Sequence, residues 1–180
     1  MSHGVTRYDL MPIPPVAAQT EYFEAGAVTI GVEYRLLDDA IAEASTIDAA
    51  SGDDSAGSIE DRGVCLHVFG NEAGERVERL RFDCFDEDPH YHYVSWQESR
   101  NEMIHIDPVA DGDPLAWSLE RIRTRLPQML ERAGAAELAR RVDLAQLEAV
   151  VPLVSEAAYR ARFHHDAAAI RRAAMAGALD

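Results

Sequence analysis

The stretch from Gly63 to Ile106 constrains the fold most, because it divides into short segments in which apolar and polar residues alternate. The links between them, NEAGER, DEDP and QESR, are rich in turn-forming residues and short enough for hairpins. Consecutive hairpins make an antiparallel meander. The four strand segments that this pattern predicts are Gly63–Phe69, Val77–Phe85, His90–Trp96 and Asn101–Ile106.

A further strand is expected upstream, from Ala27 to Leu36. Here Val28, Ile30, Val32 and Tyr34 alternate with Thr29, Gly31, Glu33 and Arg35. Alternate side chains of a strand point to opposite faces, so one face of this strand should be buried and the other should contact water. The sequence therefore predicts a sheet of about five strands.

The chain after the sheet has the signals of helices. Asp113 followed by Pro114 is typical of an N-cap and a first helical position, and Gly134 is placed to end the helix. Leu115, Leu119, Ile122, Leu126 and Met129 form one apolar stripe along it. With these helices packed on one face of the meander, the predicted fold class is α+β.

Three further helical segments should follow. One spans Ala135–Val142, and a second begins after Asp143 and runs up to Pro152. Ser155 is expected to cap the last, alanine-rich helix. Its narrow apolar stripe consists of Tyr159, Phe163, Ile170 and Ala174. Such a stripe suits packing inside the molecule, and it also suits contact with a protein partner or a second copy of the chain.

Two segments are predicted to lie outside the regular structure. Residues 1–24 contain Pro12, Pro14 and Pro15, which favour an extended N-terminal arm. Residues 37–61 are rich in Ala, Ser, Gly and acidic residues, and they favour a mobile loop within a single domain of residues 25–180. A solvated spacer, a lid and a partner-binding segment are all compatible with this loop.

Composition excludes several classes of function. All 17 positively charged residues are arginines, so the chain has no lysine for a Schiff base, for pyridoxal phosphate or for a phosphate-binding P-loop. A formal charge of -15 repels nucleic acids and anionic membrane surfaces. No stretch approaches the ~18 apolar residues of a membrane span, and the N-terminal residues do not resemble a signal peptide. These features predict a cytoplasmic protein.

Nucleophilic chemistry finds no support in the sequence. The chain has no GxSxG motif and no glycine-rich phosphate loop. Cys65 and Cys84 lie within predicted strands without a CxxC pairing, and they are interpreted as buried core residues.

One face of the predicted meander gathers polar residues that could form a site. If the hairpin turns fall at Asp86–Pro89 and Gln97–Arg100, Asp83 stands opposite His92, and His92 stands opposite His105. His67 lies on the same face, opposite Arg79. Leu66, Val68, Leu80, Phe82, Cys84, Tyr91, Tyr93, Ile104 and Ile106 fall on the other face and form a plausible core.

Three interpretations of this polar face remain open. Asp83, His92 and His105 match the ligand types of a two-histidine, one-carboxylate centre for Zn, Fe or Mn. The four other candidates are His67, Arg79, Arg81 and His90, which could instead bind a ligand or transfer a proton without metal. A structural network, in which the arginines pair with the carboxylates, explains the same residues.

The segment RFDCFDEDPHYHY, together with DGDPLAWSLERIRTRLPQMLERAG, resembles a family of small uncharacterised bacterial proteins known only as a domain of unknown function. The resemblance covers roughly Gly63 to Gly134. It combines an aromatic and histidine-rich hairpin with the proline-opened helix. It implies a discrete domain and assigns no activity and no catalytic residue.

The function that these features favour is a non-catalytic binding or accessory protein, with no cofactor, which contacts a protein partner or a second copy through its last helix. The alternative is a small metal-dependent enzyme or metal-binding protein with one divalent ion on the sheet face. Whether the protein is an enzyme stays open at this stage.

Overall fold

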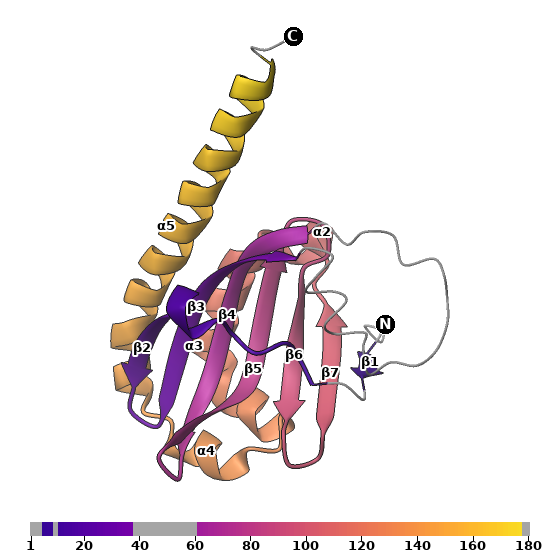
Figure 1. The fold of residues 1–180 in the computed structure, drawn as a ribbon. Helices are drawn as coiled ribbons and strands as arrows, with labels where there is room; N and C mark the ends of the chain where they lie inside the picture. Colours follow the sequence, from indigo (N-terminus) through magenta and orange to yellow (C-terminus); the bar gives the residue numbers. More distant parts are fainter. Residues whose placement is uncertain (1–4, 9–10, 38–60, 178–180) are drawn as a thin grey trace.

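The computed structural model describes residues 5–8, 11–37 and 61–177, and its centre is one antiparallel sheet (Figure 1). The seven strands lie in the order β1-β7-β6-β5-β4-β3-β2. From β2 to β7 each strand pairs with the next one in the chain, so the meander is confirmed. The strands are β1 (Val5–Tyr8), β2 (Glu21–Ala25), β3 (Val28–Leu37), β4 (Asp61–Glu72), β5 (Glu75–Phe85), β6 (His90–Ser95) and β7 (Arg100–His105).

The expected number of about five strands is wrong, because two strands come from the N-terminal residues. β2 is joined to β3 by a tight turn in which Gly26 adopts a φ of 65°. β1 pairs with β7 at the far edge of the sheet. Neither strand has a pronounced apolar face, and Ala25 is the only buried residue of β2. Hydrophobic alternation could not reveal such edge strands, whose position depends on backbone pairing.

The helices follow the sheet in the chain. Together with the 3-10 turn η1 (Ala17–Gln19), they are α2 (Pro108–Asp111), α3 (Pro114–Arg132), α4 (Ala136–Arg141) and α5 (Leu144–Gly177). The α+β class is therefore confirmed.

Both ends of α3 form as the sequence predicts. An Asp113 carboxylate oxygen accepts a hydrogen bond from the Ala116 amide at 2.9 Å, and Pro114 begins the helix. At the other end Gly134 has a φ of 84°, which glycine adopts at little cost. The Ala135 amide donates to the Leu130 carbonyl at 2.9 Å, which is the bond of a Schellman motif.

The last two predicted helices form one helix instead. The Asp143 carboxylate accepts hydrogen bonds from the Ala145 and Gln146 amides and so caps α5, as expected. However, α5 continues through Pro152 and Ser155 up to Gly177. Val151 and Val154 are buried on either side of the break point. Their packing offsets the single backbone hydrogen bond that the proline removes.

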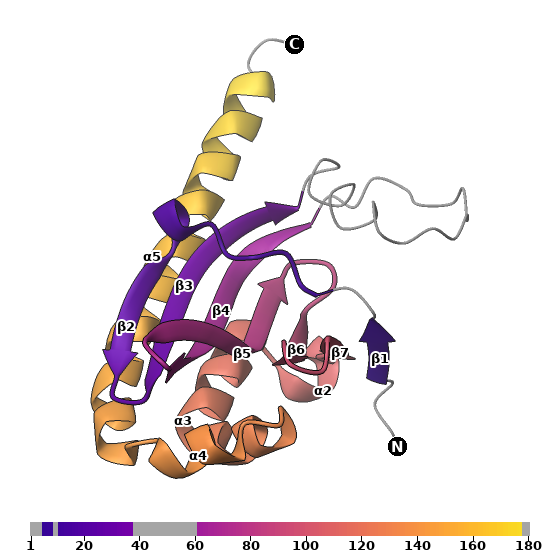
Figure 2. The same ribbon diagram turned by 60° about the horizontal axis from the view of Figure 1, so that its bottom comes forward.

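The helices cover one face of the sheet, as Figure 2 shows with the bottom of the molecule turned forward. The core lies between these two layers and contains the whole predicted stripe of α3. Its fully buried side chains include Val28, Ile30, Leu66, Val68, Leu80, Phe82, Leu115, Ile122, Leu126, Leu130 and Leu147. The α5 helix extends past the sheet at its C-terminal end (Figure 1).

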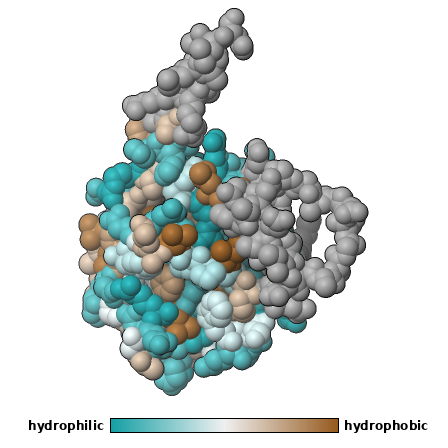
Figure 3. Space-filling model, in the orientation of Figure 1, coloured by the Kyte–Doolittle hydropathy of each residue, from teal (hydrophilic) through white to brown (hydrophobic). Residues whose placement is uncertain are grey.

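The opposite face is crossed by residues 11–20, which we call the strap (Figures 1 and 2). The strand order requires this path, because β1 and β2 occupy opposite edges of the sheet. Six steps between neighbouring strands, each about 4.8 Å, span roughly 29 Å. Figure 3 shows this side as a largely hydrophilic surface with scattered hydrophobic patches.

The predicted acidic loop lies outside the described residues, except for its ends. Leu37 closes β3 and Asp61 opens β4, and the two residues are partners in the strand register. The two strands of this pair therefore stay together up to the point where the described chain stops.

Replacing Leu130 with Ala should lower the free energy of unfolding by about 2–5 kcal/mol, because it removes a fully buried side chain between α3 and the sheet. The same change at Leu144, which is 61% exposed, should cost much less. Urea denaturation followed by circular dichroism measures both values. Equal losses at the two positions would contradict the packing described here.

Candidate metal centre

The site residues come from β5, β6 and β7, and their registers differ from the sequence expectation by two residues. Asp83 stands opposite His90, whereas His92 was expected there. His105 stands opposite His90, whereas it was expected opposite His92. Since side chains alternate with a period of two, a shift of two residues exchanges partners and leaves every side chain on its expected face.

Each shift has a cause in the turn between the two strands. At the β5–β6 turn, the Asp61 carboxylate accepts hydrogen bonds from the Glu87 and Asp88 amides at 3.1 and 2.9 Å. These bonds draw the turn toward β4, so the hairpin opens wider than four residues. At the β6–β7 turn, Ser99 adopts a φ of 48° and the turn begins one residue early, at Trp96.

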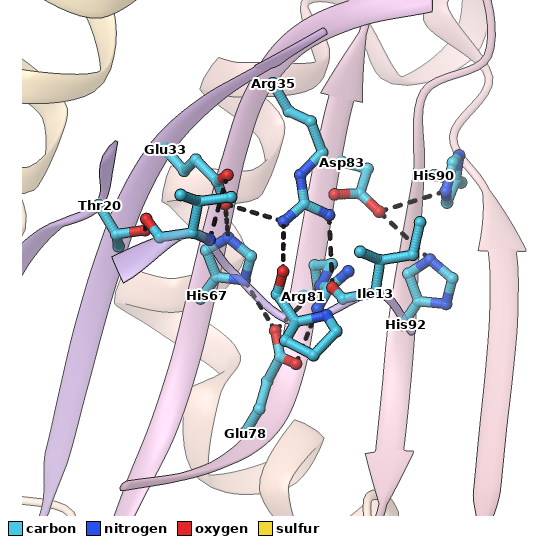
Figure 4. Close-up of polar contacts among 12 residues, drawn as sticks. Ile13, Thr20, Glu33, Arg35, His67, Glu78, Arg81, Asp83, His90 and His92 are labelled. Atoms are coloured by element: carbon cyan, nitrogen blue, oxygen red, sulfur yellow. Dashed lines mark hydrogen bonds and ion pairs between the residues drawn. The ribbon is translucent and has the colours of Figure 1, made fainter. Parts of the chain in front are cut away.

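Three potential ligand atoms converge on the face opposite the helices. Asp83 Oδ2 lies 3.3 Å from His90 Nε2 and 3.2 Å from His92 Nε2 (Figure 4). Ligand atoms of the three residues all lie within 4.8 Å of one another. The side chains of Asp83, His90 and His92 are only 6%, 12% and 8% exposed. This group, Asp83, His90 and His92, is called the triad below.

The other ring nitrogen of each triad histidine is held by an oxygen atom. His90 Nδ1 lies 2.7 Å from the Asp88 carbonyl oxygen, which can only accept a hydrogen bond. His92 Nδ1 lies 2.7 Å from Asn101 Oδ1. Donation from both Nδ1 atoms leaves both Nε2 atoms with lone pairs that point toward Asp83. Metal-ligating histidines commonly have this outer arrangement.

The triad needs a positive charge between its members. With both histidines neutral, two lone pairs and a carboxylate face one another, and this arrangement is repulsive. Burial by itself lowers the pKa of His90, but the hydrogen bond and the charge of Asp83 raise it above its usual value. Burial alone would raise the pKa of Asp83, and the hydrogen bonds of the two histidines hold it well below its usual value. A proton or a metal cation would relieve the repulsion.

His105 stays outside the triad. Its Nδ1 lies 2.7 Å from Asp88 Oδ1, and its side chain is 51% exposed. Its ring centroid lies 6.3 Å from that of His90. The structure therefore places His105 at the solvent end of the site, where it contacts the residue whose carbonyl oxygen orients His90.

A chain of buried charges adjoins the triad on β3, β4 and β5. His67 is fully buried between two carboxylates, with Nδ1 2.7 Å from Glu78 Oε1 and Nε2 3.1 Å from Glu33 Oε2. Arg81 donates two hydrogen bonds of 2.9 Å to Glu78. Burial lowers the pKa of His67, but hydrogen bonds to the two glutamates raise it above its usual value. Both ring nitrogens face carboxylate oxygens, which can only accept hydrogen bonds, so the geometry favours the imidazolium form.

A β-bulge brings Glu78 to this face. The register of β4 and β5 shifts between Val68 and Phe69, so that Glu78 and Arg81 lie on the same side although they are three positions apart in the chain. Arg79, expected opposite His67, instead pairs with Glu72 at 2.7 Å. Arg81 takes the position opposite His67.

The strap forms hydrogen bonds with charged residues of this buried chain. Arg35 donates to the carbonyl oxygens of Ile13 and Pro14, at 3.4 and 3.2 Å, and pairs with Glu33 at 2.9 Å. The Val16 amide donates to the other Glu33 oxygen at 3.4 Å. Figure 4 shows Ile13 on the side of the sheet that carries Asp83 and His92. The strap therefore covers a polar sheet face, and its backbone groups form hydrogen bonds with two of the buried charged side chains.

Sequence reasoning placed five of its candidates in this region: Asp83, His92, His90, His67 and Arg81. It missed Glu33, Arg35, Glu78 and Asn101. Glu33 and Arg35 alternate with the apolar residues of β3, and that pattern assigned them to the correct face as water-exposed residues. In the structure both residues are buried, because the strap contacts them. The sequence did not predict the path of the strap.

The fold and the site define an α+β domain with a covered, charged sheet face. The sequence profile of a family described as a domain of unknown function, DUF7700, matches residues 22–158. This match spans more than half of the 180 residues, so the chain belongs to that family. Comparisons with curated proteins and with solved structures each found no significant match. Among the described residues, no helix has the length and apolar character needed to cross a membrane.

Replacing His67 with Gln should cost on the order of 3–5 kcal/mol of unfolding free energy at pH 6, because it removes a buried cation from between two carboxylates. Since the pKa of His67 is raised in the folded state, its contribution is complete below about pH 6.5 and is lost as the pH rises through the folded-state pKa. The difference between wild type and variant should therefore shrink from pH 6 to pH 9.

Urea denaturation at several pH values measures this difference. The matched control is His164→Gln, since His164 is exposed on α5 and its loss should have little effect at any pH. A difference that grows toward alkaline pH would show that His67 is neutral in the folded protein.

Proposed function

We propose that the protein binds one divalent transition-metal ion at Asp83, His90 and His92. The observation that carries this proposal is the convergence of two imidazole Nε2 atoms on one carboxylate oxygen, at 3.3 and 3.2 Å. Imidazole and carboxylate together suit zinc, iron and manganese. An ion between these atoms would replace the repulsion among them with three favourable contacts.

The outer contacts support the same proposal. Nδ1 of each histidine is held by a carbonyl-type oxygen, which fixes both the ring orientation and the tautomer that presents Nε2. Asp83 Oδ1 is buried and accepts no hydrogen bond of normal geometry among the described residues. Such an orphaned oxygen is costly unless a cation or another donor satisfies it.

The proposed role of the ion is structural within a non-catalytic binding protein. The triad side chains are buried on the strap side of the sheet. A groove of about 860 Å³ lies elsewhere, between the strap, β3 and α5, and none of the triad residues lines it. A buried ion bound to β5 and β6 would link these two strands, and its binding energy would add to the stability of the fold.

A second candidate function, self-association through α5, rests on a different observation. Phe163 is 76% exposed and Tyr159 is 41% exposed. The two are four residues apart and so share one face of a helix that extends past the sheet (Figure 1). We propose that this aromatic face contacts α5 of a second copy, because the contact would remove both rings from water.

Metal-stripped protein without a histidine tag should bind one equivalent of Zn²⁺ in isothermal titration calorimetry. His90→Ala and His92→Ala should abolish this binding, and Asn101→Ala should weaken it by about 10–100-fold, because Asn101 orients a ligand without contacting the ion. Affinity should also fall as the pH drops, because a proton competes for His90, whose pKa is raised.

His105→Ala is the matched control and should retain binding within a few fold, since His105 contacts Asp88 and lies outside the triad. Circular dichroism establishes that each variant keeps the fold. Wild-type protein that takes up no zinc, iron or manganese would refute the proposal. Loss of binding in His105→Ala alone would move the centre to the solvent end of the site.

Sedimentation velocity at increasing protein concentration should show the chain passing from monomer to dimer. Phe163→Asp should remain monomeric, because a charge placed on the aromatic face opposes its burial. Val109→Asp provides the control, since Val109 is 96% exposed on α2, outside α5. A wild-type protein that stays monomeric throughout, or dimers that persist in Phe163→Asp, would contradict this contact.

A further inference from the structure

The buried sheet face next to the triad contains a thiol whose position has a consequence for metal binding. Cys65 of β4 is the register partner of Asp83 and is fully buried. One straight row runs across five strands and consists of Glu33, Cys65, Asp83, His90 and His105. The flanking Val64 and Leu66 point into the helix-side core, so the Cys65 side chain lies on the face of the triad.

We propose that Cys65 supplies the fourth protein ligand of the metal centre. This inference rests on the proposed function and completes its ligand set as one cysteine, one aspartate and two histidines. The ion it fits is zinc, whose structural sites are nearly always four-coordinate and tetrahedral with ligands of these types. The triad alone supplies three ligands, one fewer than a structural zinc site needs.

The orphaned oxygen of Asp83 points to the same arrangement. Asp83 Oδ2 lies 3.3 and 3.2 Å from the Nε2 atoms of His90 and His92, whereas Oδ1 is buried and accepts no hydrogen bond of normal geometry among the described residues. Cys65 stands directly opposite Asp83 on the neighbouring strand, so the two side chains are adjacent on this face. The sulfur is not among the ligand atoms that lie within 4.8 Å of one another, so coordination by Cys65 requires its side chain to move toward the triad.

The other buried groups on this face are already engaged. Glu33 and Glu78 bind His67 and the arginines, and His105 binds Asp88 near solvent. Cys84, the other cysteine, lies on the helix side, where its sulfur is 3.4 Å from the Ser118 hydroxyl oxygen of α3. Cys65 is therefore the buried thiol that can reach the triad side of the sheet.

Charge balance favours a thiolate at this position. The face contains three carboxylates, of Glu33, Glu78 and Asp83, and three cations, of Arg35, Arg81 and the His67 imidazolium. These charges cancel, so a divalent ion adds two uncompensated positive charges in a buried region. On coordination the thiol releases its proton to solvent and the sulfur–metal bond forms, which removes one of the two charges.

Cobalt(II) substitution tests this assignment in the chain of 180 residues. Co²⁺ added to metal-stripped protein should give the visible bands of a tetrahedral ion together with a near-ultraviolet sulfur-to-cobalt charge-transfer band. Cys65→Ser should lose the charge-transfer band and bind Co²⁺ at least about tenfold more weakly, the lower end of the cost for an outer-shell partner. Cys84→Ser, the matched control, should keep both features.

X-ray absorption at the zinc edge of wild-type protein needs no variant and covers the case in which Cys65→Ser does not fold. It should show one sulfur neighbour at about 2.3 Å beside nitrogen and oxygen neighbours at about 2.0–2.2 Å. Metal bound with no sulfur neighbour, or a charge-transfer band that survives in Cys65→Ser, would refute the Cys65 assignment and leave the triad proposal standing. No metal uptake by the wild type would refute both.

Discussion

The salt bridges of His67 with Glu33 and Glu78 are the interactions on which the strap side of the molecule depends. All three side chains are essentially buried, and each carries a charge that water cannot solvate. A carboxylate or an imidazolium in such a place is tolerated only with charged and hydrogen-bonded partners. The partners come from β3, β4, β5 and, through Arg35, from the strap, so these elements must be in place together.

The two faces of the sheet are therefore held by different physical forces. On the helix side, apolar side chains of the strands pack against α3, α4 and α5, and the burial of apolar surface stabilises the contact. On the strap side, a short extended segment contributes backbone carbonyl and amide groups to buried charges. A narrow strap can cover this face because buried charges are stabilised by hydrogen-bond partners at particular positions. An apolar face is stabilised in proportion to the surface area removed from water, and it needs a broader cover.

The triad lies at the end of this charged region, and its properties follow from that position. The guanidinium of Arg81 acts on Asp83 in addition to the two histidines and helps to keep the carboxylate ionised. An ionised, buried aspartate beside two oriented imidazoles is suited to a cation. The proposed metal centre therefore does not require a separate cavity, because the sheet itself supplies the ligands and the strap side supplies the cover.

The sequence by itself determined that the aspartate and the three histidines of the site region share a face, where α3 begins and ends, and that the chain has no lysine. Alternation along a strand has a period of two, so the assignment of Asp83, His90, His92 and His67 to one face is insensitive to shifts of two residues. Asp113, Pro114 and Gly134 act through their own backbone and side chains, so local sequence was enough to place the ends of that helix.

Tertiary structure alone decided which of those residues meet. Asp83 faces His90 because Asp61, from another strand, binds the amides of the β5–β6 turn. Glu78 reaches His67 because a bulge interrupts the register of β4 and β5, and Arg79 is turned to Glu72. Glu33 and Arg35 are buried because the strap must cross the sheet to join its two edges. These outcomes depend on contacts between residues far apart in the chain, and a local pattern of polar and apolar residues does not encode them.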